Sequence, residues 1–370
     1  MKLFFNLTPL SYHAINSCFI FLLVIFLSCN TSNCLIKLPE NITIPALFAF
    51  GDSVFDTGNN NGIRTIVKAN FPPYGRDFPG GKPTGRFSNG KIATDIIAEE
   101  LGIKELLPPY LGSNLQSQDL KTGVNFASGG SGFDPLTSII VEVISADKQL
   151  EMFKTYTENL RKLLGEEKTR TILSESVYIV SAISNDIANT YFHTPTRILE
   201  YNVSSYSQLL VTSASTFLEE LYKLGARRLL YFGAPPIGCL PMQRTLGGGI
   251  ERKCVENYNT MAKLFNSEVI AALERINGKN KESRMVYVDI YTPLLDMIQN
   301  PQEYGFEVWD KGCCGTGLVE VSFLCTEPNI FTCENASTYL FWDSYHPTER
   351  AYRIIVDYLL QNAVNKIFTN

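Results

Sequence analysis

A serine follows a short apolar run near the start of the chain, and its position suits a nucleophile. The run Leu47–Phe50 has the length of a strand and ends at Gly51, so Asp52 and Ser53 come next. A buried parallel strand would leave its sheet at this point, where open α/β folds bind ligands. A hydroxyl there is a candidate nucleophile if the chain also supplies a base and donors for an oxyanion. An ordinary turn is the alternative, because Gly, Asp and Ser are common turn formers.

The supply of histidine restricts the choice of base. The chain has three histidines, and His13 falls in the N-terminal apolar region. His193 has no acidic residue within the three residues before it, whereas Asp343 lies three residues before His346. A carboxylate at that spacing can accept a hydrogen bond from the imidazole within a turn and leave the other ring nitrogen facing a serine. A surface turn that caps the following helix would show the same spacing. The sequence thus predicts Asp343 and His346 as the partners of Ser53.

Two further segments offer donors for an oxyanion. The glycine-rich stretch 125–132 follows a second apolar run, and its glycines allow backbone N–H groups to approach a ligand closely. Its spacing differs from the G-x-G-x-x-G pattern of dinucleotide sites. Asn185 follows a third apolar run and could direct its amide N–H at a developing negative charge, although a strand-end Asx turn would also explain it. Such a donor typically contributes ~2.7–4 kcal/mol to catalysis.

The elements that must position these residues alternate between two patterns. Apolar runs typical of strands occupy residues 47–50, 123–127, 177–183, 228–233 and 285–290. Apolar residues recur with helical spacing over residues 150–164, 217–224, 258–276 and 349–367. Alternation of this kind predicts a parallel sheet with helices on both faces. The stretches 56–92 and 292–342 are rich in Gly, Pro and aromatic residues and are expected to be loops above the sheet.

Length and charge limit the classes of partner. The 370 residues carry a net charge of −5 and no basic block, so nucleic acid is not an expected partner. The N-terminal apolar core Cys18–Cys29 is shorter than the ~20 residues of a spanning helix and suits a signal peptide. We expect a signal peptide over residues 1–30, cleaved between about 28 and 34, and a single domain over residues 40–368. The mature protein is expected to be secreted, without a stable membrane anchor.

Cysteine usage agrees with an oxidising compartment. Six of the nine cysteines lie in the second half of the chain: Cys239, Cys254, Cys313, Cys314, Cys325 and Cys333. Cys239 and Cys254 flank a glycine-rich loop and are expected to form one disulfide, and the other four allow three connectivities. A zinc site is less favoured, because adjacent cysteines lack the usual spacing of ligands. Three sequons suit glycosylation in the same compartment, at Asn41, Asn202 and Asn335.

The order of these blocks resembles that of the plant GDSL esterases/lipases of the SGNH hydrolase superfamily, which are extracellular, lipase-like proteins. The resemblance covers nearly all of the chain after the leader. It rests on seven ordered motifs: FGDSVFDTGNNN (50–61), GRFSNGK (85–91), GVNFASGGSG (123–132), SND (184–186), GAPPIGCLP (233–241), KGCCGTG (311–317) and FWDSYHPTE (341–349).

The resemblance implies a fold and a set of roles. The fold would be a flavodoxin-like three-layer α/β/α sandwich with a mainly parallel, five-stranded sheet, without a cofactor or a metal. Ser53 would be the nucleophile, His346 the base and Asp343 the residue that orients it. The oxyanion hole would comprise the Ser53 N–H, a glycine N–H of the 129–132 loop, for which we select Gly130, and the Asn185 side chain. The implied reaction is cleavage of carboxylic esters, in particular acyl lipids, through an acyl-enzyme.

One residue departs from the family pattern. The third block usually reads Gly-x-Asn-Asp, and here Ile183 occupies the glycine position. A branched side chain there is expected to shift the backbone and weaken the oxyanion hole. This departure motivates an alternative, a secreted binding protein on the same fold with little or no activity. A third alternative is an esterase or acyltransferase acting on acetylated cell-wall polysaccharide. Aromatic residues of the long loops could stack on its sugars or line an acyl groove instead: Phe71, Tyr74, Phe78, Phe306 and Trp309.

Overall fold

A parallel sheet lies at the centre of the computed structural model, which describes residues 42–112, 114–326 and 331–368. Its strands are β1 (Leu47–Gly51), β2 (Val177–Ser181), β3 (Arg228–Phe232) and β4 (Arg284–Val288), in the spatial order β1-β2-β3-β4. Gly51 pairs with Ser181, and Phe232 pairs with Val288. The carboxyl ends of the strands therefore form one edge of the sheet, as expected for side chains that are to meet in one site.

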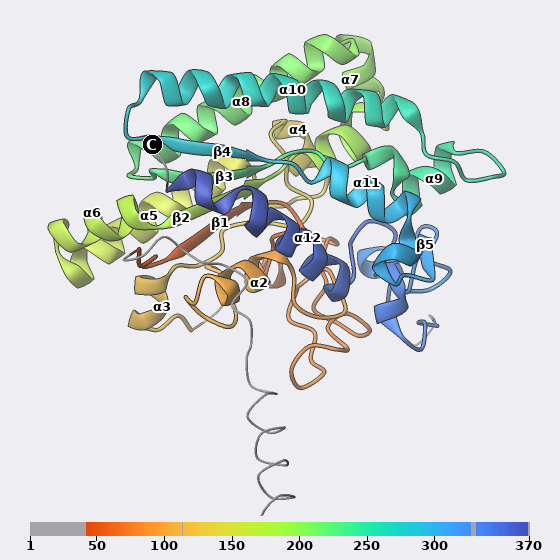
Figure 1. Cartoon of the computed structure of the whole chain (residues 1–370), viewed down its shortest axis with the longest axis horizontal. Helices are drawn as coiled ribbons and strands as arrows, with labels where there is room; N and C mark the ends of the chain where they lie inside the picture. The colour runs from red at the N-terminus through yellow and green to blue at the C-terminus, as the bar shows by residue number, and fades with distance from the viewer. Residues whose placement is uncertain (1–41, 113, 327–330, 369–370) are drawn as a thin grey trace, which may run out of the picture. The chain divides into compact units, whose positions relative to one another are not determined.

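Helices cover both faces of this sheet (Figure 1). α5 (Ala146–Leu164), α8 (Val203–Lys223) and α10 (Glu256–Lys279) lie on one face, and α2 (Ala93–Glu100) and α12 (Glu349–Asn362) on the other. On the first face, the ring of Phe50 lies 5.4 Å from that of Phe153 in α5 and 5.7 Å from that of Phe217 in α8. Every residue of β1 and β2 is buried, which explains their continuous apolar sequences. The expected three-layer α/β/α sandwich is confirmed.

The predicted helices all form, and α5, α8 and α10 begin earlier than their apolar patterns indicated. The segment 349–367 divides into α12 and a 3₁₀ turn, η7 (Val364–Ile367). Side-chain caps account for several starts: Thr348 accepts a hydrogen bond from the Ala351 N–H at 3.3 Å at the start of α12. The remaining α-helices are shorter: α3 (Ser117–Thr122), α4 (Pro135–Ile140), α6 (Glu166–Glu175), α7 (Pro195–Glu200), α9 (Pro241–Gly247) and α11 (Tyr291–Gln299).

The fifth expected strand, 123–127, follows the edge of β1 but makes only one bridge to it, between Asn125 and Ala49. The Phe126 N–H donates to the Ala49 carbonyl at 2.8 Å, as a strand there would. One step further, the side chain of Gln149 accepts from the Gly51 N–H and donates to the Gly51 carbonyl, both at 2.9 Å. The Gly51 N–H, which a fifth strand beside β1 would need for its hydrogen bonds, is thus bound to Gln149. The regular sheet therefore has four strands among the described residues.

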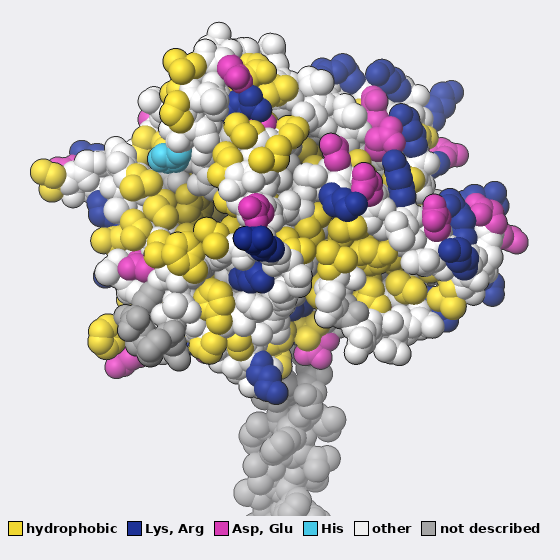
Figure 2. Space-filling model, turned by 180° about the vertical axis from the view of Figure 1, so that it is seen from behind, with side chains coloured by type: hydrophobic (Ala, Val, Ile, Leu, Met, Phe, Trp, Pro, Cys, Tyr) yellow, Lys and Arg dark blue, Asp and Glu magenta, His cyan; other side chains and the backbone are white. Residues whose placement is uncertain are grey.

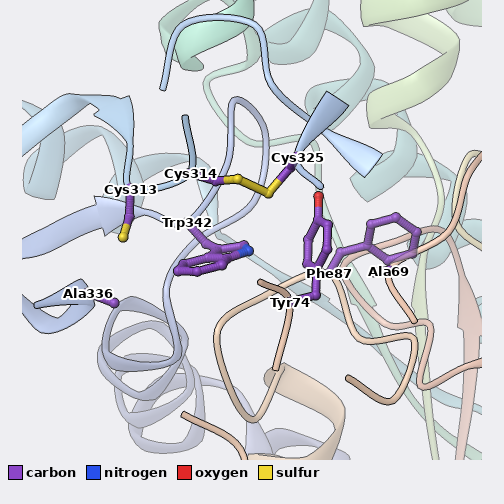
Figure 3. Packing of buried hydrophobic residues seen from close by; sticks show 8 residues of the cluster. All are labelled: Ala69, Tyr74, Phe87, Cys313, Cys314, Cys325, Ala336 and Trp342. Carbon is purple, nitrogen blue, oxygen red and sulfur yellow. A yellow bond between two sulfur atoms is a disulfide. The ribbon is translucent and has the colours of Figure 1, made fainter. Parts of the chain in front are cut away.

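The stretch 292–342, expected as loop, contains a second small sheet and two disulfides. β5 (Val308–Gly312) and β6 (Tyr339–Phe341) pair in parallel. Cys313–Cys333 and Cys314–Cys325 are bonded, which selects one of the three connectivities. The expected Cys239–Cys254 bond is confirmed. Figure 3 shows the indole of Trp342 between the Cys314–Cys325 bond and the rings of Tyr74 and Phe87, in one buried cluster.

The expected signal peptide, its cleavage region and the sequon at Asn41 lie outside the described residues. Asn202 and Asn335 are exposed, so both remain accessible for the predicted glycosylation. No helix among the described residues is long and apolar enough to cross a membrane.

Candidate active site

The turn after β1 presents Ser53 at the carboxyl edge of the sheet. Gly51 adopts φ +139°, and a side chain there would meet the Ser181 carbonyl oxygen at 1.8 Å. Only glycine permits this close approach of β1 to β2. The Asp52 N–H continues the ladder to the Ser181 carbonyl at 2.9 Å, and the Asp52 side chain accepts from the Val54 N–H at 3.2 Å. Asp52 thus shapes the turn that carries the serine.

His346 and Asp343 meet Ser53 in a continuous hydrogen-bonded chain. The Ser53 Oγ lies 2.7 Å from His346 Nε2, across 293 residues of sequence. His346 Nδ1 lies 2.9 and 2.8 Å from the two carboxylate oxygens of Asp343. Asp343 is fully buried, and its Oδ1 also accepts from the N–H groups of Tyr345 and His346, at 2.8 Å each. The arrangement can move a proton from the serine to the imidazole while the carboxylate holds the ring in place.

His193, the other described histidine, takes no part in this chain. Its Nε2 lies 3.2 Å from the hydroxyl of Tyr258, and its side chain contributes to the wall of the cavity above Ser53.

The expected oxyanion donors lie around the same cavity, which Ser53, Gly130, Asn185 and His346 all line. The Gly129 N–H donates to the carboxylate of Asp56 at 2.9 Å and is therefore occupied. The N–H groups of Ser53 and Gly130 have no acceptor among the described residues. Asn185 is half-buried, and its Nδ2 donates to the Ser131 carbonyl at 3.0 Å. Two N–H groups without an acceptor among the described residues and one side-chain amide thus belong to residues that line the same cavity as the Ser53 hydroxyl.

Comparison with known proteins decides the family. The model of the GDSL-like lipase/acylhydrolase family matches residues 47–359. The chain is 53% identical to GDSL esterase/lipase At5g42170 of Arabidopsis thaliana, over 90% of this chain and 89% of that protein. It is 51% identical to GDSL esterase/lipase EXL3 of the same plant, over 90% of this chain and 91% of that protein. The chain belongs to the GDSL-like lipase/acylhydrolase family. The family predicted from the ordered motifs is confirmed.

The residue that departs from the GDSL pattern fits its site without backbone strain. Ile183 is fully buried, and its φ lies outside the left-handed region, which only Glu142, Arg252 and Ser322 adopt among the described non-glycine residues. Glycine is required where φ is positive or where a side chain would clash. The φ of Ile183 does not require glycine at position 183, and Asn185 is followed by a short π-helix, Asp186–Tyr191.

Asp186, the next residue of the same GDSL block, connects the two segments that carry the oxyanion donors. Its carboxylate accepts from the N–H groups of Phe133 and Asp134 at 2.7 and 3.1 Å and from the Thr137 hydroxyl at 2.5 Å. Burial raises the pKa of Asp186 to about 8, against the lowering effect of these hydrogen bonds. The sequence motif contained this residue, but only the structure shows that it ties the end of β2 to the glycine loop.

Two other buried carboxyl groups lie under the nucleophile turn. Burial raises the pKa of Asp52 to about 7 and that of Asp56 to about 6. Asp52 Oδ2 has no hydrogen-bond partner among the described residues. The acid that orients His346 is therefore Asp343 by geometry, as the sequence predicted, and Asp52 serves the turn.

A cavity of about 450 Å³ opens above Ser53 and His346. Most of its wall is apolar, formed by Ile66, Val67, Ile140, Val141, Met242, Val321, Phe323 and Leu324. Several of these side chains reach solvent at the rim: Ile66 is 63% exposed and Phe323 53%. Hydrophobic side chains also gather over one side of the face shown in Figure 2. A second, narrower space of about 70 Å³ lies on the other side of Ser53, lined by residues such as Phe232, Leu294 and Ile355.

The donor set of the site does not suggest a metal. No group of three or more His, Cys, Asp or Glu side chains suited to hold a metal ion occurs within residues 42–112, 114–326 and 331–368.

Proposed function

We propose that the chain hydrolyses carboxylic esters through Ser53, His346 and Asp343. The observation that carries the proposal is the Ser53 Oγ–His346 Nε2 distance of 2.7 Å, with the other ring nitrogen on a buried carboxylate. His346 Nε2 accepts the Ser53 proton as the serine oxygen attacks the ester carbonyl carbon. Asp343 keeps the proton on Nδ1 and stabilises the imidazolium.

The developing oxyanion would be held by the Ser53 N–H, the Gly130 N–H and the Asn185 amide. Gly130 is selected over Gly129 because the Gly129 N–H already donates to Asp56. Collapse of the tetrahedral intermediate breaks the bond to the alcohol oxygen, which takes the proton from His346 Nε2. Water then attacks the acyl-enzyme with His346 again as base, which releases the acid and restores Ser53.

The cavity supports an ester with a substantial apolar part, such as an acyl lipid. Its aliphatic side chains offer contact to hydrocarbon, beside polar side chains such as Asn189, Thr190 and His193. The loop aromatics that could have stacked on a polysaccharide lie outside the cavity wall; three are buried and two half-buried: Tyr74, Phe78 and Phe306, and Phe71 and Trp309. Ile183, which motivated an inactive alternative, has no positive φ, so its side chain does not by itself require a strained backbone. These observations favour the lipid ester over the two alternatives.

Replacement of the nucleophile tests the reaction. Ser53→Ala should abolish hydrolysis of p-nitrophenyl butyrate and labelling by a fluorophosphonate probe, because no other hydroxyl faces His346 Nε2 among the described residues. Ser344→Ala is the matched control, since the Ser344 hydroxyl is buried nearby and has no hydrogen-bond partner. Retained hydrolysis in Ser53→Ala, or wild-type protein that neither hydrolyses nor labels, would refute the proposal.

We also propose that the chain is secreted, on the basis of its leader sequence and its disulfides. The apolar core Cys18–Cys29 and the disulfides in the second half of the chain support passage through an oxidising compartment. Sequencing of the N-terminus of protein recovered from the culture medium of plant cells tests it: a mature chain that begins between about residues 28 and 34 is expected, and protein retained in the cells with residue 1 intact would contradict it.

A further inference from the structure

The carboxylate of Asp343 has one donor that the sequence did not indicate. The hydroxyl of Tyr74, 269 residues earlier in the chain, lies 2.8 Å from Asp343 Oδ2, the same oxygen that faces His346 Nδ1. Tyr74 is only 1% exposed. Both oxygens of the carboxylate are therefore occupied, Oδ1 by backbone N–H groups and Oδ2 by Tyr74 and the imidazole.

The direction of the Tyr74 hydrogen bond follows from its second partner. The Ser322 N–H lies 2.8 Å from the same hydroxyl, and an N–H can only donate. The single phenolic proton is therefore free to point at Asp343. Burial, with the nearby charge of Asp343, raises the pKa of the Tyr74 phenol well above its ordinary value, so the proton stays in place at neutral pH.

Ser322 in turn belongs to the wall of the large cavity. It adopts φ +51°, and its hydroxyl lies 2.7 and 2.8 Å from the carbonyl oxygens of Ile66 and Lys68. The neighbouring side chains Val321 and Phe323 line the cavity from one side and Ile66 from another. Ser322 thus connects its own segment of the cavity wall to the segment of Ile66 and Lys68, and its N–H connects both to Tyr74.

The Tyr74 ring packs against other aromatic rings near Asp343 and His346. The Tyr74 ring lies 6.2 Å from Trp342, which precedes Asp343 in the chain, and 6.0 Å from Phe87. The Phe87 ring lies 5.1 Å from the imidazole of His346. Figure 3 shows Tyr74, Phe87 and Trp342 in the same cluster as Cys325, the residue whose disulfide closes the 315–324 loop onto Cys314.

We propose that Tyr74 is a positioning residue that holds Asp343 in its orientation toward His346 and couples it, through Ser322, to the wall of the substrate cavity. The inference rests on the proposed roles of Asp343 and His346. Loss of the Tyr74 hydroxyl removes a charge-assisted hydrogen bond from Asp343 and weakens the alignment of the imidazole during proton transfer.

Tyr74→Phe isolates the hydroxyl, because the ring and its packing are kept. We expect kcat with p-nitrophenyl butyrate to fall roughly tenfold, the loss typical of about 1.4 kcal/mol, with KM within about twofold of wild type. A carboxylate with one donor fewer attracts the imidazolium proton more strongly, so the acidic limb of kcat/KM should move to higher pH by about 0.5–1 unit. The other titratable side chains acting on this pair are Asp52, Tyr345 and Tyr352, and they are unchanged in the variant.

Tyr178→Phe is the matched control for a purely structural effect. Tyr178 is equally buried, and its hydroxyl donates to the Leu173 carbonyl at 2.9 Å, at the end of β2 away from the site. Tyr178→Phe loses one buried hydrogen bond and Tyr74→Phe two, one with Asp343 and one with the Ser322 N–H. Only Tyr74→Phe should change kcat and the pH profile. Equal kinetics for the two variants would overturn the proposal, as would a Tyr74→Phe enzyme with wild-type kcat and an unmoved acidic limb.

Ser322→Gly tests the coupling to the cavity wall. Glycine accepts φ +51° and keeps the N–H that faces Tyr74, but it removes the hydroxyl contacts to the carbonyls of Ile66 and Lys68. We expect KM for p-nitrophenyl octanoate to rise several-fold with kcat less affected than in Tyr74→Phe. Unchanged KM would refute the coupling. If wild-type protein neither hydrolyses esters nor labels, the proposed function fails first; if it does both and Tyr74→Phe has no effect, only the inference fails.

Discussion

The groups on the two sides of Ser53 differ in how far their hydrogen bonds are satisfied. On one side, His346 and Asp343 are buried, and each polar atom of their side chains has a partner at 2.7–2.9 Å. On the other side, the Ser53 and Gly130 N–H groups have no acceptor among the described residues, and the Asn185 amide is bound to the Ser131 carbonyl at 3.0 Å. The side of His346 and Asp343 thus has its hydrogen bonds in place in the free protein. The side of the proposed oxyanion donors keeps N–H groups without an acceptor.

The difference follows from the stage of the proposed reaction at which each group is needed. The proton acceptor must be aligned with the Ser53 hydroxyl before the reaction begins, so its hydrogen bonds exist in the free protein. The oxyanion exists only in the transition state, and donors that await it contribute most when nothing else occupies them. N–H groups of Ser53 and Gly130 without a protein acceptor therefore agree with the proposed binding of an oxyanion.

Replacement of His346 or Asp343 should give the largest loss of activity. His346→Ala removes the base and Asp343→Asn the charge that orients it, and we expect kcat to fall by roughly 10⁴-fold or more in each case. Steady-state hydrolysis of p-nitrophenyl butyrate measures the loss. The double variant should be little worse than His346→Ala alone, because the two residues act as a unit; additive losses would contradict that view.

Removal of one donor should cost less than removal of the base. Asn185→Ala deletes the amide and should lower kcat by roughly 10²–10³-fold, with KM little changed. Asn189→Ala is the comparison and should have a smaller effect, because Asn189 contacts Asn185 but is not one of the proposed donors. Its Nδ2 donates to Asn185 Oδ1 at 3.0 Å, and its Oδ1 accepts from the Tyr345 hydroxyl at 2.9 Å. A loss in Asn185→Ala confined to KM would place this residue in substrate binding instead.

The backbone donor can be tested through its conformation. Gly130 adopts φ +85°, and an added Cβ would lie 3.1 Å from Val141 Cγ2, so Gly130→Ala should turn the N–H and lower kcat roughly tenfold. Gly165→Ala introduces the same kind of backbone strain at φ +83° with no atom within 4 Å, at the end of α5. Similar thermal stability of the two variants with loss of activity in Gly130→Ala alone is the expected result, and equal activity would remove Gly130 from the donor set.

The last prediction concerns Asp186, which connects the segments that carry the proposed oxyanion donors, and the pH dependence of stability. Aspartates of an unfolded chain titrate near ~3.9, whereas burial raises the pKa of Asp186 to about 8. The folded state therefore keeps a proton that the unfolded state releases, and the free energy of unfolding should fall as pH rises from about 4 to 8, by about 1 kcal/mol per unit. Urea unfolding at several pH values measures the slope. Asp186→Asn should reduce it and leave the part due to Asp52 and Asp56, whose pKa values burial also raises. A slope that rises with pH in wild type would contradict the sign.

Much of the fold was predictable because the strands are buried on both faces. The sequences of β1 to β3 read as continuous apolar runs, and Gly51 marks the end of β1. Two features lay beyond local patterns. The segment 123–127 fails to extend the sheet because of Gln149, a residue of another element. β5 and β6 are short and partly exposed, and nothing in their own sequences indicates a partner.

The candidate site divides in the same way. Ser53, Asp343 and His346 were accessible from residue type and spacing, because an acid three residues before a histidine is a local signal. Tyr74 was not, since its contact with Asp343 depends on how a loop of residues 56–92 packs above the sheet. The effect of Ile183 on the oxyanion hole stays a prediction, because Ile183 has no positive φ, and a φ outside the left-handed region does not by itself require glycine.

The separation of 293 residues between Ser53 and His346 also bears on the order of synthesis. A ribosome makes the nucleophile and both oxyanion segments early and the base only near the end, at residue 346 of 370. Until then the growing chain carries a serine without a group to activate it. Truncated products that stop before Asp343 would be inert toward the esters of the cell that makes them, and activity would first appear when the last helix, α12, can close behind the base.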